Sequence, residues 1–304
     1  MLRSWIERAR RRFAPATSAG FAIGRDYVGF AHLAAAAGAW RVQTLTETRL
    51  DTPLFSGAPS PQAAAALTRA LQTLAGSLAR SYLPVHVSLP DAAVRWGTFE
   101  LDQMPKTRAA RLDLAQLRFG REGKNGSDVY ACQPLERDGN KHLLFGMAAG
   151  AAWTRLVSEV LFQAGVVLWS LSANVCRQFN RFHDELTRSS GALVALAPDA
   201  WSLLLWDPQG RPRYARARWR TAPNDHAEIA LEAERSILAY VHGHPERSIA
   251  RVFAVAGLET GVMAEALDAR LREPCARLSD EESALRTTQG AASAAQSLAA
   301  ALER

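Results

Sequence analysis

The chain has 304 residues, of which 48% are hydrophobic and 22% are charged, and its formal net charge is +6. This composition is that of a folded globular protein with one large core or two smaller ones, and it excludes an intrinsically disordered chain. Its three cysteines are odd in number and far apart, which excludes a disulfide framework and a close-spaced zinc motif.

Residues 1–14 carry most of the net charge, with five arginines against one glutamate. Apolar residues recur there at helical spacing, which predicts a basic amphipathic helix on an anionic membrane surface. The candidate contact residues are Leu2, Arg3, Trp5, Ile6, Arg10 and Phe13. A helix packed on its own domain, with a solvated basic face, explains the same pattern equally well.

The start of the chain lacks the apolar core and the cleavage site of a signal peptide. Hydrophobic runs are broken well short of the roughly 20 apolar residues that a spanning helix needs. We therefore expect a cytoplasmic protein. We expect no nucleic-acid partner, because the body of the chain has no sustained basic stripe interleaved with aromatic residues.

The segment 15–83 reads as three strands followed by a helix. Gly20–Leu33 predicts two strands around a turn at Gly24-Arg25-Asp26, and Trp40–Leu45 predicts a third strand. A loop at Pro53–Pro61 then leads into a predicted helix. Its apolar stripe consists of Leu67, Leu71, Leu74, Leu78 and Tyr82.

Residues 84–146 predict a small inserted module of short strands and polar turns, beginning with a strand at Val85–Pro90. The segment 147–188 then returns to the first half. It predicts a helix at Ala151–Gln163, a strand at Val166–Leu171 and a helix at Asn174–Leu186.

Residues 189–304 repeat the plan of the first half. Strands are expected at Ala192–Ala197, Trp201–Trp206 and Tyr214–Trp219, before a long helix at about Asp225–Val241. A strand at Val252–Val255, a helix at Val262–Leu271 and an alanine-rich helix at Gly290–Leu302 complete the prediction. Two halves with the same order of elements imply a duplicated α/β fold.

Three short motifs carry a resemblance to a known family. Ile23, Gly24 and Val28 match a first phosphate loop of the form Asp-Ile-Gly-x-x-x-Val-Lys. The segment Leu193–Trp201 stands where a second phosphate loop is expected, and Val255-Ala256-Gly257 stands where an adenosine motif is expected. With the order of elements, these residues resemble the PilM-like actin-like ATPase family of type IV pilus assembly, whose relatives include MshI and the cytoplasmic domain of GspL.

The resemblance implies an α/β, actin-like (ribonuclease H-like) duplicated fold with a small inserted subdomain. It also implies a lid over the nucleotide in the second half, which is reduced here to the short loop Arg220–Asp225.

The nucleotide motifs are degenerate. Ala22 and Ala195 replace the two aspartates to which the resemblance assigns the hydrated metal, and Ala197 replaces a glycine. The candidate cofactor-binding remnants are Gly24, Arg25, Asp26 and Gly257. We therefore expect a pseudo-ATPase without a metal site, and binding of magnesium ATP without turnover stays open.

The resemblance implies a cytoplasmic scaffold at the inner-membrane face that binds the N-terminal tail of a PilN-type single-pass inner-membrane protein. It also implies a link to the cytoplasmic pilus motor ATPase. The family places the tail groove between the first half and the insert, here the surfaces of 84–146 and the adjoining helices.

Two alternatives stay open. The first is an active actin-like ATPase that uses Asp26, Asp199 or Asp207 in place of the missing carboxylates. The second is a peripheral membrane-surface protein without a pilus connection.

Overall fold

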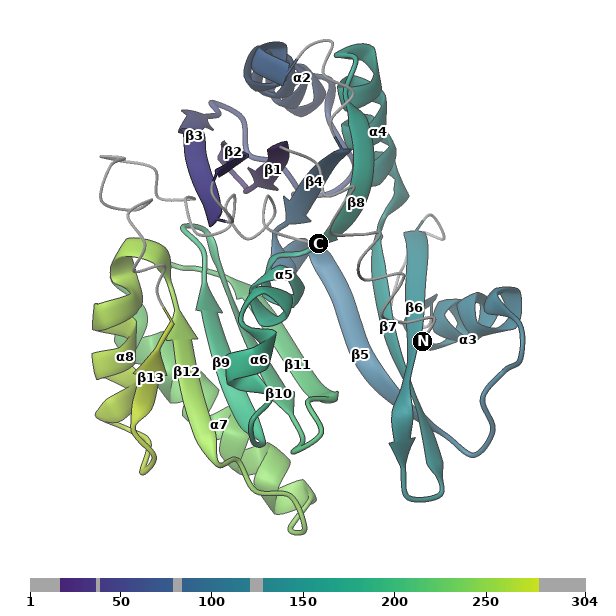
Figure 1. The fold of residues 1–304 in the computed structure, drawn as a ribbon, viewed down its shortest axis with the longest axis vertical. Coiled ribbons are helices and arrows are strands. Elements are labelled where there is room, and N and C mark those ends of the chain that lie inside the picture. Colours follow the sequence, from purple (N-terminus) through teal and green to yellow (C-terminus); the bar gives the residue numbers. More distant parts are fainter. Residues whose placement is uncertain (1–16, 37–38, 79–83, 121–127, 279–304) are drawn as a thin grey trace.

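A computed structural model describes residues 17–36, 39–78, 84–120 and 128–278 (Figure 1). The predicted segment 1–14, Tyr82 and the helix expected at 290–302 lie outside these residues. Among the described helices, none combines the length and the hydropathy that a bilayer crossing requires.

The first half is built on a five-stranded sheet with the order β3-β2-β1-β4-β8. The strands are β1 (Thr17–Ile23), β2 (Tyr27–Ala36), β3 (Ala39–Arg49), β4 (Pro84–Leu89) and β8 (Val167–Ala173). β1, β2 and β3 are antiparallel neighbours, whereas β4 pairs in parallel with both β1 and β8. The three strands predicted at the start of the chain are therefore confirmed.

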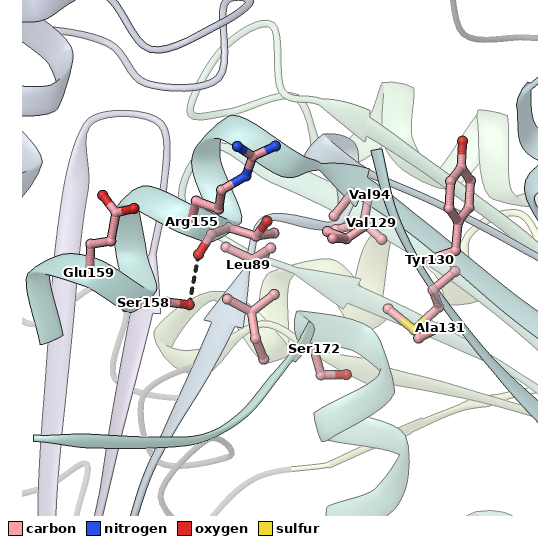
Figure 2. Close-up of a pocket in the computed structure, with 13 residues that line it drawn as sticks. Leu89, Val94, Val129, Tyr130, Ala131, Arg155, Ser158, Glu159 and Ser172 are labelled. Atoms are coloured by element: carbon pink, nitrogen blue, oxygen red, sulfur yellow. Dashed lines mark hydrogen bonds between the residues drawn. The ribbon is translucent and has the colours of Figure 1, made fainter. Parts of the chain in front are cut away.

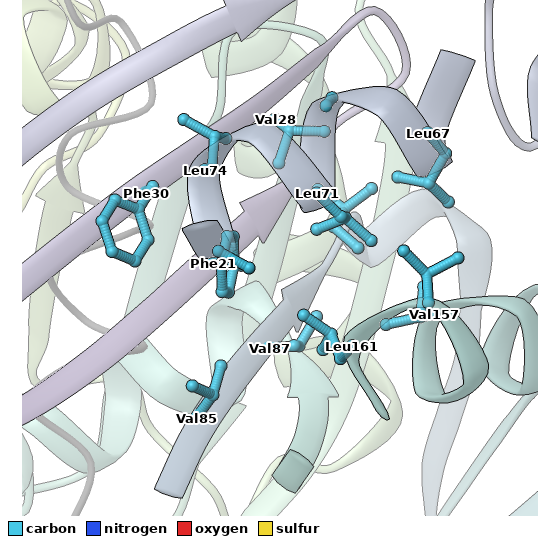
Figure 3. Packing of buried hydrophobic residues seen from close by; sticks show 14 of the residues in the cluster. Phe21, Val28, Phe30, Leu67, Leu71, Leu74, Val85, Val87, Val157 and Leu161 are labelled. Atoms are coloured by element: carbon cyan, nitrogen blue, oxygen red, sulfur yellow. The ribbon is translucent and has the colours of Figure 1, made fainter. Parts of the chain in front are cut away.

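Helices α2 (Pro61–Ala75) and α4 (Ala151–Gln163) cover one face of this sheet (Figure 1). Ser60 caps α2, since its hydroxyl oxygen accepts a hydrogen bond from the Ala63 amide at 3.2 Å. Leu67, Leu71 and Leu74 pack against β1, β2 and β4, as Figure 3 shows. The leucines of the predicted apolar stripe therefore belong to the core of the first half.

The second half repeats this topology, with the sheet order β11-β10-β9-β12-β13. Its strands are β9 (Gly191–Leu196), β10 (Ala200–Trp206), β11 (Pro212–Trp219), β12 (Arg251–Val255) and β13 (Cys275–Arg277), and its helices are α7 (His226–Gly243) and α8 (Thr260–Asp268). The predicted duplication is confirmed, because both sheets have three antiparallel strands followed by parallel ones. Residues 220–225 join β11 to α7 directly, so the reduced lid is confirmed as well.

Helices α5 (Asn174–Arg181) and α6 (His183–Leu186) connect the two halves. Val175 and Phe179 of α5 share a hydrophobic cluster with Leu193, Leu204 and Phe253 of the second sheet.

A separate three-stranded sheet with the order β5-β7-β6 forms the insert. It contains β5 (Val94–Leu101), α3 (Arg108–Gly120), β6 (Asp128–Asp138) and β7 (Lys141–Gly150). The expected boundary at residue 84 falls too early, because β4 hydrogen-bonds to β1 in the first sheet. The insert sheet starts at Val94, and β7 extends to Gly150, beyond the expected end at 146.

Helix α3 was not expected from the sequence. Its mean hydropathy is low, and among its residues only Ala115 and Phe119 are buried. Thr107 caps it, accepting from the Ala110 amide at 3.1 Å.

Candidate functional site

Two equivalent β-turns meet between the halves. In the first half, the Gly24 amide donates to the Tyr27 carbonyl at 2.9 Å, and in the second the Ala197 amide donates to the Ala200 carbonyl at 2.8 Å. The third residue of each turn is an aspartate, Asp26 or Asp199. These are the places of the two phosphate loops that the resemblance implies.

Each turn accepts a further backbone hydrogen bond at the carbonyl group of its aspartate. The Leu50 amide donates to the Asp26 carbonyl and the Arg220 amide donates to the Asp199 carbonyl, both at 2.8 Å. Each donor follows the third strand of its half, so the duplicated topology gives both turns the same support.

The two turns contact each other directly, because the Arg25 amide donates a hydrogen bond to Oδ2 of Asp199. Burial raises the pKa of Asp199 to about 6, although the hydrogen bond from Arg25 opposes this shift. Asp26 differs from its counterpart, since it lies at the surface and pairs with Arg49 at 3.2 Å. Only one of the two equivalent aspartates therefore bridges the halves.

Arg220 ties together the loops of the second half that border this cleft. Its buried guanidinium donates to Asp225 and to Glu259 at 3.0 Å each, and to the Ala197 carbonyl at 3.3 Å. Glu259 follows Gly257, which adopts a positive φ of 55°. The second turn, the reduced lid and the predicted adenosine loop therefore form one hydrogen-bonded unit.

The residues present do not fit a magnesium nucleotide. Ala22 and Ala195 have buried methyl side chains at the two positions where the resemblance implies carboxylates beside the metal. The Arg25 amide, which would donate to a phosphate, already donates to Asp199. Among the described residues, no cluster of three His, Cys, Asp or Glu side chains could hold a metal ion.

Asp91 forms a second polar link between the halves. It follows β4 and is buried, and it accepts from the Ser202 hydroxyl of β10 at 2.6 Å and from the Val175 amide at 2.9 Å. Burial raises the pKa of Asp91 to about 6 despite these hydrogen bonds, and the nearby charge of Asp199 raises it further.

A cavity of about 410 Å³ lies between the first half and the insert. Figure 2 shows Arg155, Ser158 and Glu159 of α4 on one side and Tyr130 and Ala131 of β6 on the other. Its apolar lining consists of Leu89, Val94, Val129, Met147, Ala149 and Leu171. Its position agrees with the predicted groove.

The cavity borders two sheet edges. Within the described residues, β8 is the last strand of the first sheet and β6 is the last strand of the insert sheet, and both contribute lining residues. Arg155 and Glu159 are exposed at the cavity, and neither forms an ion pair with another described residue. The cavity thus combines an apolar lining, two charges of opposite sign and strand edges.

An ionic cluster clamps the far end of the insert to the second half. The nearly buried Arg213 pairs with Asp207 of its own half at 2.8 Å and with Asp138 of the β6–β7 hairpin. Arg211 and Arg247 also pair with Asp138, at 3.1 and 3.3 Å. Burial alone would raise the pKa of Asp138, but the three arginines hold it below its usual value. The wall of the cavity is thereby anchored to the other half of the molecule.

The fold defines the class of protein. No protein-family model matches the chain, and no curated protein matches it in sequence. A Bacteroides thetaiotaomicron protein described as having an actin-like ATPase fold superposes with a TM-score of 0.55 at 12% identity, covering 86% of this chain and 91% of that one. The chain has the actin-like fold.

Two further solved structures belong to pilus and secretion machines. The PilM-PilN type IV pilus biogenesis complex superposes with a TM-score of 0.69 at 14% identity, covering 94% of this chain and 97% of that one. The cytoplasmic domain of EpsL, an inner-membrane component of the type II secretion system of Vibrio cholerae, gives 0.52 at 11% identity, with 95% and 96% covered.

Sequence reasoning found part of this site. Gly24, Arg25 and Asp26 do form the first turn, and Gly257 does open the loop before α8. Their role in binding a cofactor stays a prediction. The bridging role of Asp199, the central position of Arg220 and the link through Asp91 were missed. A comparison of Gly24-Arg25-Asp26 with Ala197-Pro198-Asp199 would have identified Asp199 as the equivalent of Asp26.

The raised pKa of Asp91 predicts a pH-dependent stability. An aspartate in the unfolded chain titrates near 3.8, so between about pH 4 and pH 6 the folded protein binds more protons. The contribution of Asp91 to the free energy of unfolding therefore falls as the pH rises through this window. Asp91→Asn should remove a decline on the order of 1–3 kcal/mol, measured by urea unfolding across the window. Ser202→Ala keeps the carboxylate and should keep the decline. Equal slopes for wild type and Asp91→Asn would contradict the assignment.

The ionic cluster predicts an unequal effect of two arginine substitutions. Arg213→Ala removes a nearly buried arginine that pairs with both Asp207 and Asp138, while Arg211 still pairs with both, and should lower the free energy of unfolding by about 2 kcal/mol or more. Arg218→Ala is the control, because Arg218 is exposed and its pair with Glu232 should contribute at most about 1 kcal/mol. Urea unfolding gives both values. Similar losses for the two variants would show that the cluster does not act as a clamp.

Proposed function

We propose that this chain is a PilM-like scaffold of a type IV pilus or related secretion apparatus. It binds the N-terminal cytoplasmic tail of a PilN-type inner-membrane protein in the cavity between the first half and the insert. The observation that carries the proposal is the apolar cavity between two strand edges, in a chain whose fold resembles that of the PilM-PilN complex over nearly its whole length.

The cavity suits an extended peptide. Its volume of about 410 Å³ is within the range of ordinary ligand sites, roughly 300–1,000 Å³. Apolar side chains of the tail would enter the lining around Val129 and Leu171, while its backbone pairs with an exposed strand edge. Arg155 and Glu159 would select charges beside the apolar residues of the tail.

The scaffold does not hydrolyse ATP in this proposal. The replacement of both metal-side aspartates by Ala22 and Ala195 supports this, as does the contact of Asp199 with the first turn. The partner would hold the chain at the cytoplasmic face of the inner membrane. The basic segment 1–14 would add a weak contact with anionic lipid, and the two attachments would act together.

A single substitution in the cavity tests the proposal. Val129 lines the cavity and is 46% exposed, so Val129→Glu should fold normally. It should weaken binding of a synthetic tail peptide from a PilN-type protein of the same organism at least about tenfold, because it places a charge in the apolar lining. Calorimetry measures both affinities.

Leu117→Glu is the matched control for this experiment. Leu117 is 56% exposed on α3, outside the cavity lining, so the variant should bind like the wild type. Absence of peptide binding by the wild type, or equal affinity for Val129→Glu, would refute the proposal.

A further inference from the structure

The cleft between the two turns is occupied by side chains of the chain itself. Above the first turn lies the ring of Tyr27, so close that a Cβ built on Gly24 would be 2.0 Å from its Cε1 atom. Tyr27 is buried, and its pKa is raised first by burial and then by the charge of Asp199. The space over this glycine, where the resemblance calls for a phosphate, is therefore filled.

Asp199 has the chemistry of a bound anion. Its Oδ2 accepts the Arg25 amide, and its Oδ1 is buried without a hydrogen-bond partner among the described residues. The Arg25 guanidinium lies over the Trp219 ring, 6.0 Å from its centroid. The main hydrogen-bond donor to this carboxylate is thus a backbone N–H of a turn, which is a common arrangement for bound anions.

An aromatic contact closes the cleft next to this hydrogen bond. Phe55 of the first half stacks with Trp219 of the second at 6.4 Å between ring centroids, and it also packs on Trp153 at 4.8 Å. Phe55 has a φ of 60°, a conformation that an aromatic residue rarely adopts and that the surrounding contacts must stabilise. Two independent contacts therefore join the halves at the same place.

We propose that the carboxylate of Asp199 is a built-in anionic ligand of the β1–β2 turn, which joins the two halves and excludes a nucleotide phosphate from the same position. The cleft is then held closed by the chain alone. This inference does not depend on binding of a partner tail.

Hydrogen exchange of the full chain tests the bridging role. Asp199→Gly removes the acceptor of the Arg25 amide, so exchange in the β1–β2 turn should become at least about tenfold faster. Asp199→Asn keeps an oxygen acceptor without its charge and should give an intermediate rate. Asp26→Asn is the control at the equivalent turn position, and it should leave the rate of the Arg25 amide unchanged. An unchanged rate in both Asp199 variants overturns the bridging role.

Binding of inorganic pyrophosphate tests the exclusion. Calorimetry without magnesium should give an affinity at least about tenfold higher for Asp199→Gly than for the wild type, because the Arg25 amide is then open to an anion. Asp113→Asn is the control, because it removes one negative charge from the exposed face of α3 in the insert, and it should bind like the wild type. Equal affinities for wild type and Asp199→Gly, or no binding by either, overturn the exclusion.

Discussion

The meeting of two β-turns is the constraint on which the arrangement of the cleft depends. A duplicated β-β-β-α topology brings the turn of each half to the same border, and each turn is held by an amide that follows the third strand of its half. Identical scaffolding does not produce identical environments, however. Asp26 lies at the surface beside Arg49, whereas the half-buried Asp199 accepts a hydrogen bond from the opposite turn. The two equivalent turns of the duplicated fold therefore make different contacts.

The insert connects this contact to the candidate peptide site. One of its surfaces forms a wall of the cavity, and its far end is held to the second half through Asp138 and Arg213. A rotation of the second half relative to the first would therefore pull on a cavity wall. Buried ion pairs suit this task because they demand a specific geometry, even though they contribute little net stability compared with apolar packing. Asp138 and Arg213, which anchor this wall, do not themselves line the cavity.

Much of the fold could be predicted from the sequence, because strands and helices in both halves have strong local patterns. The leucine stripe of α2 and the turn at Gly24-Arg25-Asp26 are examples. Helix α3 was missed because its sequence is arginine-rich, mostly exposed and low in mean hydropathy. β4 was assigned to the insert because strand pairing is not a local property. The contact of Arg25 with Asp199 spans 174 residues. Only the duplication could have indicated it, through the matching place of aspartate in both turns.

The degenerate motifs can be understood from the cost of buried charge. A carboxylate at Ala22 or Ala195 would lie in a fully buried strand position and would need a cation to compensate its desolvation. Without such a cation, alanine is the less costly residue on a buried strand. The carboxylate that joins the two turns, Asp199, can be tolerated because a backbone amide donates a hydrogen bond to it. Loss of the metal-side carboxylates and retention of one bridging carboxylate therefore follow from the same physical rule.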